Sequence, residues 1–257
     1  MTWEAKRWVR AGATLLALGA VAGALAAPEE IQVYLDDKEA PGGISVDWHN
    51  NYVLSGRSSA SYPGEQPPAE VYRLTPELNV GLTDTFEYGL YVLTTHNREG
   101  DWHANGVKMR LKYIAPHDEK EGLFWGVNME AGKSDLAIEP YPWNAELKGI
   151  VGMHSGPWTL GLNLNLDRSL DRHAGPVDAD VDIKLNYALT AKTQLGVESY
   201  NELGPLSHFD SWSRNSKMIF GVVDTEVAGL ALNAGLGRGT NGTSDRWTLK
   251  FILNTPF

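Results

Sequence analysis

Residues 246–257, RWTLKFILNTPF, end the chain with the pattern of a strand. From Trp247 to Leu253 every second residue is large and apolar, and the final Phe257 stands in the same register. Successive side chains of a strand point to opposite faces, so this segment has one apolar and one polar face. A soluble sheet buries such an apolar face in a core, whereas a membrane barrel turns it toward lipid. The rest of the chain decides between these two arrangements.

The first 26 residues have the composition of a secretory signal peptide. Three basic residues stand among the first ten, an Ala/Leu/Gly/Val-rich run follows from Ala11, and Ala24-Leu25-Ala26 places small residues before a cleavage site at Ala27. The alternative, a transmembrane anchor, needs about 20 apolar residues, and this run is shorter. No Cys occurs in the 257 residues, which excludes disulfide bonds, thiol chemistry and a lipid-anchored cysteine. We therefore expect an exported protein whose residues 1–26 are removed.

Eleven further segments repeat the alternation of the last one. In residues 158–167, for example, Trp158 and four leucines alternate with Thr, Gly, Asn and Asp. Such a period of two predicts strands. The twelve expected strands are 44–52, 72–82, 86–92, 107–113, 123–130, 145–154, 158–167, 180–189, 195–200, 218–222, 230–236 and 247–253.

Short and long connections alternate between these strands. Short turns are expected at 83–85, 117–121, 155–157, 190–192 and 227–229, and longer polar loops at 54–68, 95–104, 131–142, 168–177, 201–216 and 238–243. Outer-membrane barrels have short periplasmic turns and long external loops. The pattern therefore predicts an all-β fold for residues 43–257, a transmembrane antiparallel up-and-down β-barrel of twelve strands in the outer membrane, with both termini in the periplasm. A soluble β-sandwich is the alternative, but its strands are usually joined by Greek-key crossovers.

Two further features concern the ends of this barrel. Residues 27–42 show no period, so they are either a periplasmic lead-in or a plug that occupies the lumen. Aromatic residues stand near the strand ends, where interfacial girdles are expected. They are Phe86, Tyr113, Trp158 and Tyr187 near the short turns, and Tyr52 and Trp143 near the long loops.

Two parts of the sequence resemble known outer-membrane signatures. The terminal strand with its final Phe257 resembles the signal that the barrel assembly machinery recognises, which implies a role for Phe257 in assembly. Gly81-Leu82-Thr83-Asp84, Glu87 and Lys112-Tyr113 resemble the central motif of a family of outer-membrane proteins labelled for the meta-pathway of phenol degradation and related to fatty-acid and aromatic transporters. The resemblance covers roughly residues 70–130 and implies a barrel that passes small hydrophobic or aromatic molecules.

Charged side chains occupy the polar face of most predicted strands. In a closed barrel this face lines the interior, so these residues are candidates to line a pore and filter solutes. They also have the composition of a ladder of ion pairs that holds the barrel open. The candidates are Asp47, His49, Arg73, Glu77, Glu87, Lys108, Arg110, Lys112, Glu130, Lys148, Asp167, Asp180, Asp182, Lys184, Glu198, Arg246 and Lys250.

The order of these charges makes two further predictions. Residues 108–112 with Lys148 form a basic arc, and residues 167–198 contribute an acidic one, so a transverse field would cross a water-filled lumen. If Ala191 centres a tight turn, Lys184 lies opposite Glu198 and Asp182 opposite Tyr200. By the same counting Lys112 comes near Glu87, and Lys108 near Glu130.

Three classes of function remain. The first is a channel for passive or weakly selective passage of small solutes, with lipid and the assembly machinery as the other partners. The second is a closed structural or adhesive barrel that acts through its external loops. The third is a lipid-modifying enzyme, for which the adjacent His154 and Ser155 are weak candidates because the sequence offers no partner for them. We predict a channel, no enzyme activity, no cofactor, no metal and no nucleic-acid partner.

Overall fold

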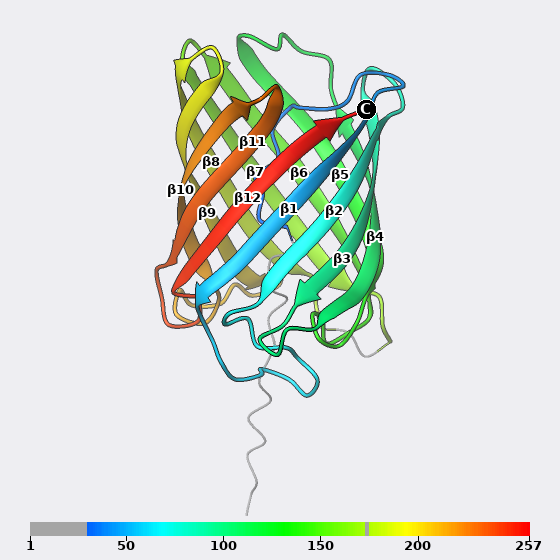
Figure 1. The fold of residues 1–257 in the computed structure, drawn as a ribbon, viewed down its shortest axis with the longest axis vertical. Coiled ribbons are helices and arrows are strands. Elements are labelled where there is room, and N and C mark those ends of the chain that lie inside the picture. The colour runs from blue at the N-terminus through cyan, green and yellow to red at the C-terminus, as the bar shows by residue number, and fades with distance from the viewer. Residues whose placement is uncertain (1–29, 173–174) are drawn as a thin grey trace, which may run out of the picture.

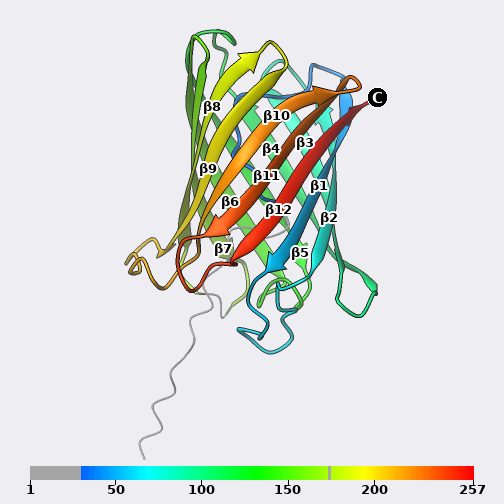
Figure 2. The same cartoon turned by 60° about the vertical axis from the view of Figure 1, so that its left-hand side comes forward.

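The computed structural model describes residues 30–172 and 175–257, so the predicted signal peptide lies outside the described residues. Twelve strands form one closed barrel, in which each strand pairs with its neighbours in the chain and β1 also pairs with β12 (Figures 1 and 2). The strands are β1 Ile44–Ser55, β2 Tyr72–Gly81, β3 Phe86–His96, β4 Trp102–Ile114, β5 Gly122–Ser134, β6 Trp143–Ser155, β7 Trp158–Ser169, β8 Asp178–Thr190, β9 Thr193–Pro205, β10 Lys217–Val227, β11 Leu230–Gly239 and β12 Trp247–Pro256. The predicted all-β, twelve-stranded antiparallel barrel is confirmed.

The apolar face of the strands lies on the outside of the barrel. On β7, Leu160, Leu162 and Leu164 are each at least 40% exposed, while the intervening Asn163 and Asn165 are buried. A soluble barrel would show the opposite arrangement, with the leucines inside. An outward apolar band around a polar interior is the pattern of membrane barrels. Among residues 30–172 and 175–257, no helix is long and apolar enough to cross a membrane.

The two ends of the barrel differ. The short turns and the C-terminus lie at one end, at the top of Figure 1, and the long loops lie at the other. Outward aromatic rings contact one another at the short-turn end: Phe86 with Tyr113 at 5.0 Å between ring centroids, Tyr113 with Trp125 at 5.7 Å, and Trp158 with Tyr187 at 4.7 Å. These rings lie at the position of an interfacial girdle.

Most of the predicted register is correct. Lys184 pairs with Glu198, Asp182 with Tyr200, and Lys112 with Glu87. The pairing predicted between β4 and β5 is wrong by two residues, since Arg110 faces Glu130 and Lys108 faces Gly132. The ladder continues past β4, where the Ala115 amide donates to the Trp125 carbonyl at 3.0 Å. The turn is therefore centred later in the chain than the sequence suggested.

Residues 30–42 lie inside the barrel and run to its short-turn end, shown in blue in Figures 1 and 2. We call them the lumenal segment. Two glycines of the barrel wall make room for it. Gly161 has no Cβ, and a Cβ there would stand 2.3 Å from Leu35 Cδ2. At the exit Gly81 exchanges backbone hydrogen bonds with Gly42 and Gly43, and a Cβ on Gly81 would stand 2.0 Å from the Ala40 carbonyl oxygen.

Candidate functional site: the barrel lumen

The lumen contains nearly all of the charged residues that the sequence placed on the inner face. Asp47 and Asp167 are half-buried, and Arg246 differs from the others because it precedes β12 and is exposed at the loop end. The buried ones are His49, Arg73, Glu77, Glu87, Lys108, Arg110, Lys112, Glu130, Lys148, Asp180, Asp182, Lys184, Glu198 and Lys250. Alternation alone therefore located most of the charged lining.

On one wall the charges form a continuous chain of contacts across β1 to β4. His49 Nε2 lies 3.0 Å from Glu77, whose other carboxylate oxygen pairs with the Arg110 guanidinium. Arg110 also binds Glu87 at 2.8 Å, and Lys112 binds the same Glu87 oxygen at 3.0 Å. These side chains are at most 3% exposed, so each charge is balanced by a neighbour inside the barrel.

A second chain of ion pairs lies on the opposite wall. Glu198 is shared by Lys184 at 3.1 Å and by Lys250, and Lys184 also contacts Asp224 at 2.9 Å. The Tyr200 hydroxyl donates to Glu198 at 2.7 Å. Asp224 was not among the predicted lumen residues, although it follows Phe220 and Val222 at the spacing of one strand face.

The predicted separation into a basic and an acidic arc holds only in part. Arg110 and Lys112 of the basic arc are paired with acids of β2 and β3. Lys148 contacts Glu146 at 3.1 Å on its own strand. Asp182 on the acidic side accepts a hydrogen bond from Asn165 at 2.7 Å. Local pairing thus neutralises much of the field that unpaired arcs would produce.

Tyr34 of the lumenal segment occupies the middle of this polar lumen. Its backbone amide donates to Asn163 Oδ1 at 2.7 Å, and Asn163 Nδ2 donates to its carbonyl at 2.9 Å. Its hydroxyl contacts the Tyr91 hydroxyl at 2.8 Å, and Lys148 Nζ lies 4.3 Å from the centroid of its ring. The wall therefore supplies polar partners to the backbone of an irregular segment, as buried peptide groups require.

The barrel also offers apolar contacts to the lumenal segment. Val33 packs with Tyr200, Phe220 and Val222 in one buried cluster, against which Ile31 is also placed. Phe220 and Val222 belong to β10, and both are buried on its inward face. β10 is apolar on both faces, since Ile219 is 47% exposed on the outside, and this double apolarity is the sequence signal for an interior contact.

At the short-turn end two histidines converge on one carboxylate of the lumenal segment. Asp36 Oδ2 lies 2.7 Å from His117 Nε2 and 2.9 Å from His154 Nε2. His117 Nδ1 lies 2.8 Å from the Ala115 carbonyl, which can only accept a hydrogen bond. Because the carboxylate also only accepts, both nitrogens of His117 must carry protons for both contacts to form. The clasp, as we call Asp36, His117 and His154, therefore contains an imidazolium.

The lumenal segment separates two chambers of the lumen. The chamber on the loop side has about 970 Å³ of empty space, part of it open to solvent, and its lining includes Ile31, Arg73 and Phe220. The chamber on the short-turn side has about 1250 Å³ and is lined mainly by polar and charged groups such as Lys112 and Asp224. A solute that crosses the barrel has to pass the segment between them.

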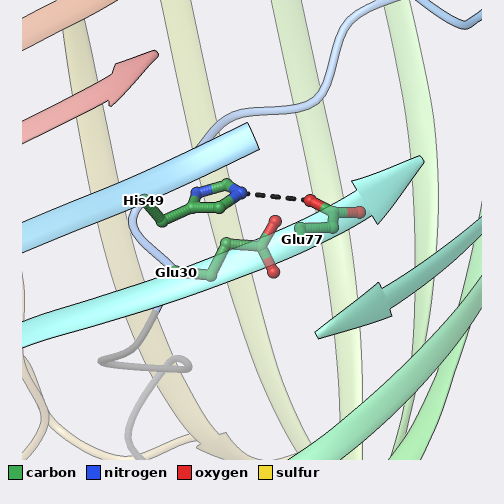
Figure 3. A group of neighbouring side chains, drawn as sticks. All are labelled: Glu30, His49 and Glu77. Carbon is green, nitrogen blue, oxygen red and sulfur yellow. Dashed lines mark hydrogen bonds and ion pairs between the residues drawn. The ribbon is translucent and has the colours of Figure 1, made fainter. Parts of the chain in front are cut away.

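Glu30, His49 and Glu77 form the group in the described chain whose ligand atoms could hold a metal ion, all within 4.8 Å of one another (Figure 3). Glu77 already pairs with the Arg110 guanidinium, so its negative charge is balanced without a metal ion. Glu30 accepts a hydrogen bond from the Tyr34 hydroxyl. Both carboxylates of this group therefore already have partners in the chain, namely His49 and Arg110 for Glu77 and Tyr34 for Glu30.

The fold is that of small, twelve-stranded outer-membrane-type barrels. No family model matches the chain. No curated protein sequence matches it either.

Solved structures match the whole barrel at low sequence identity. The COG4313 outer membrane channel from Pseudomonas putida F1 is similar with a TM-score of 0.59 and 13% identity, over 89% of this chain and 100% of that one. The NanC porin has a TM-score of 0.53 and 9% identity, over 81% and 97% of the two chains. The KdgM porin, solved with disordered oligogalacturonate, has a TM-score of 0.51 and 8% identity, over 83% and 99%. At these identities the likeness concerns the fold.

Proposed function

We propose that the protein is an outer-membrane channel for small solutes in which the lumenal segment is a movable plug. The observation that carries the proposal is the position of residues 30–42, which lie between two chambers of one barrel. The outward apolar band and the aromatic rings at the short-turn end support a membrane location. The three similar structures named above are an outer membrane channel and two porins.

The plug is held by contacts that can open without refolding of the barrel. Tyr34, Asp36 and Glu39 use hydrogen bonds and ion pairs to wall residues. Each neutral hydrogen bond contributes about 0.5–1.5 kcal/mol net and each bond to a charged group about 1.5–3 kcal/mol, because water can replace the partners. The strands, by contrast, are joined by complete ladders around the ring. Withdrawal of the segment would join the two chambers into one path.

The solute class follows from the chamber on the loop side. Its lining combines apolar side chains such as Ile31, Met218 and Phe220 with two guanidinium groups and four carboxylates, and the Arg57 guanidinium is already paired with Glu65. This mixture suits small molecules with an apolar body and a polar group. The resemblance of residues 70–130 to aromatic and fatty-acid transporters implies the same class.

A disulfide tether tests the plug. We expect Leu35→Cys with Gly161→Cys to form a cross-link, because Leu35 packs on the place of the missing Gly161 side chain and a disulfide needs Cβ atoms about 4 Å apart. The chain has no other Cys. In planar bilayers the oxidised double variant should conduct little, and reduction should restore the conductance of the unmodified protein.

The two single-Cys variants are the controls and should not respond to reductant. Equal conductance of the oxidised and reduced double variant would refute the movable plug. Absence of conductance in every form, with the barrel correctly folded, would instead favour the closed structural barrel.

Protease treatment of intact cells tests the proposed orientation. The long loops should be cleaved near Arg98 and Arg214, which are exposed at the loop end, while the short turn at residues 82–85 should stay intact. Fragments are identified by mass spectrometry, with broken cells as the control in which both ends are accessible. Cleavage at the short turn in intact cells would reverse the orientation.

A further inference from the structure

Basic side chains lie on the outer, apolar face of the barrel at its loop end. Lys133 on β5, Arg168 on β7 and Arg238 on β11 share the strand face that carries the exposed leucines and other apolar residues. All three are exposed, and none forms an ion pair with a carboxylate among residues 30–172 and 175–257. In a chain with a net charge of −10, these outward cations without carboxylate partners are available to bind an external anionic group.

Each of these cations lies beside a tryptophan. Lys133 is directly opposite Trp143 in the β5–β6 ladder, and Arg238 is directly opposite Trp247 in the β11–β12 ladder. The Arg238 guanidinium lies 5.5 Å from the centroid of the Trp247 ring. Tryptophan prefers the level of the lipid headgroups, so these rings place the basic groups at that level.

Lys133 and Arg168 belong to one patch. Trp143 lies between them on β6, where the Leu170 amide, two residues after Arg168, donates to its carbonyl. Arg168 is opposite Ala145 on the same strand. Lys133 and Arg168 are two strand spacings apart, which is roughly 10 Å across the sheet. Their side chains are long enough for both charged groups to contact the same headgroup. Trp143 is 53% exposed between them and offers an apolar surface.

Among the described residues, the exposed cations of the short-turn end, Lys120 and Lys192, stand in turns rather than on the outward face of a strand. Its outward rim carries rings such as Phe86, Trp158 and Tyr187. Lys192, the exposed cation of the turn between β8 and β9, is paired with Glu226 at 2.7 Å. The two rims therefore differ in the chemistry of their outward side chains. The loop rim is complementary to anionic headgroups.

We propose that Lys133, Trp143 and Arg168 bind the phosphate groups of acidic lipid headgroups in the leaflet around the loop end, and that Arg238 with Trp247 repeats the arrangement on the other side of the barrel. This rests on the membrane location proposed above. The guanidinium and ammonium groups bind phosphate oxygens by charge-assisted hydrogen bonds. The tryptophan packs on the adjoining acyl chain or sugar. Such contacts order a ring of lipid at the rim where the loops emerge.

Native mass spectrometry of the folded protein in a neutral detergent tests the proposal. The probe is diphosphoryl lipid A, with phosphatidylcholine as the lipid that has no net charge. We expect Lys133→Gln with Arg168→Gln to bind lipid A roughly tenfold more weakly than the unchanged protein, and to bind phosphatidylcholine equally. The matched control, Lys120→Gln with Lys192→Gln, removes the same charge at the short-turn end and should leave lipid A binding unchanged.

Three outcomes would overturn the proposal. They are equal loss of lipid A in the two double variants, no loss in either, and full competition by inorganic phosphate, which would make free phosphate the ligand. Gel mobility of the unheated protein verifies that each variant is folded, and the changed residues are exposed, so misfolding is not expected. Failure of the protein to insert into vesicles would instead count against the membrane location. The two failures are therefore distinguishable.

Discussion

Replacing Glu198 with Gln is expected to lower the free energy of unfolding by about 3–5 kcal/mol, the usual cost of removing one partner from a buried ion pair. Glu198 balances two cations, Lys184 and Lys250, and the Lys250 side chain is 0% exposed. Without Glu198, Lys250 keeps hydrogen bonds to the Ile31 carbonyl and the Tyr200 hydroxyl, but no carboxylate contact of the kind that now neutralises it. Unfolding in urea, followed by tryptophan fluorescence in vesicles, measures the loss.

A matched exposed pair and a rescue variant make this test specific. Glu226→Gln removes the partner of Lys192, which is 66% exposed, and should cost less than about 1 kcal/mol. Adding Lys250→Met to Glu198→Gln removes the unpaired buried charge and should restore much of the lost stability. A Glu198→Gln variant no less stable than Glu226→Gln would show that water in the lumen screens these charges.

Because of the same network, exchanging Lys184 and Glu198 would not be a clean test of the strand register. The pairing of Lys184 with Glu198 follows from the tight turn between β8 and β9, and the sequence predicts it correctly. Each partner, however, has a second contact from a more distant strand, since Lys184 also binds Asp224 and Glu198 also binds Lys250. Exchanging Lys184 and Glu198 would place a carboxylate beside Asp224 and an ammonium group beside Lys250, and both of these are contacts between like charges. Local alternation determines neighbours in the sheet but not contacts across the lumen.

Prediction from sequence worked where one physical rule dominated. Strands with one apolar face, such as β7 and β12, have side chains that alternate between the outside of the barrel and the lumen, so their number, order and inward charges could be derived. β10 was harder because both of its faces are apolar. Phe220 and Val222 lie inside, against Val33. The inward apolar face of β10 is explained by its packing against the lumenal segment, whose position the sequence does not reveal.

The position of residues 30–42 could not be derived from periodicity. The segment has no regular pattern because its backbone is satisfied by side chains of the wall, such as Asn163, rather than by a strand ladder. Its contacts also combine residues far apart in the chain, with Tyr34 meeting Tyr91 and Lys148. The sequence therefore favours a periplasmic lead-in over a plug, and it contains no signal for the clasp of Asp36, His117 and His154.

The clasp should make passage through the barrel depend on pH. Burial lowers the pKa of His117, but its contacts with the Ala115 carbonyl and Asp36 outweigh this and raise the pKa above its ordinary value. Burial raises the pKa of Asp36, but hydrogen bonds from His154 and His117 outweigh this and lower it. A raised histidine pKa gives stabilisation that is complete below about pH 6.5 and is lost as pH rises through the raised value. A lowered aspartate pKa gives stabilisation that is complete above about pH 4 and is lost as pH falls through the lowered value.

The plug should therefore be held most firmly between about pH 4 and 6.5, and single-channel conductance should increase when the pH is raised from about 5.5 to 8.5. His117→Gln should conduct at pH 5.5 as the unchanged protein does at pH 8.5, because Gln cannot supply the positive charge that Asp36 faces at 2.7 Å. His208→Gln, which alters an exposed loop residue, is the control and should keep the full pH response. The oxidised Leu35→Cys, Gly161→Cys variant should show no response, since its plug is fixed near Gly161 whatever the charge of the clasp. A pH response that survives His117→Gln would assign the titration to another group and would leave the clasp with a purely structural role.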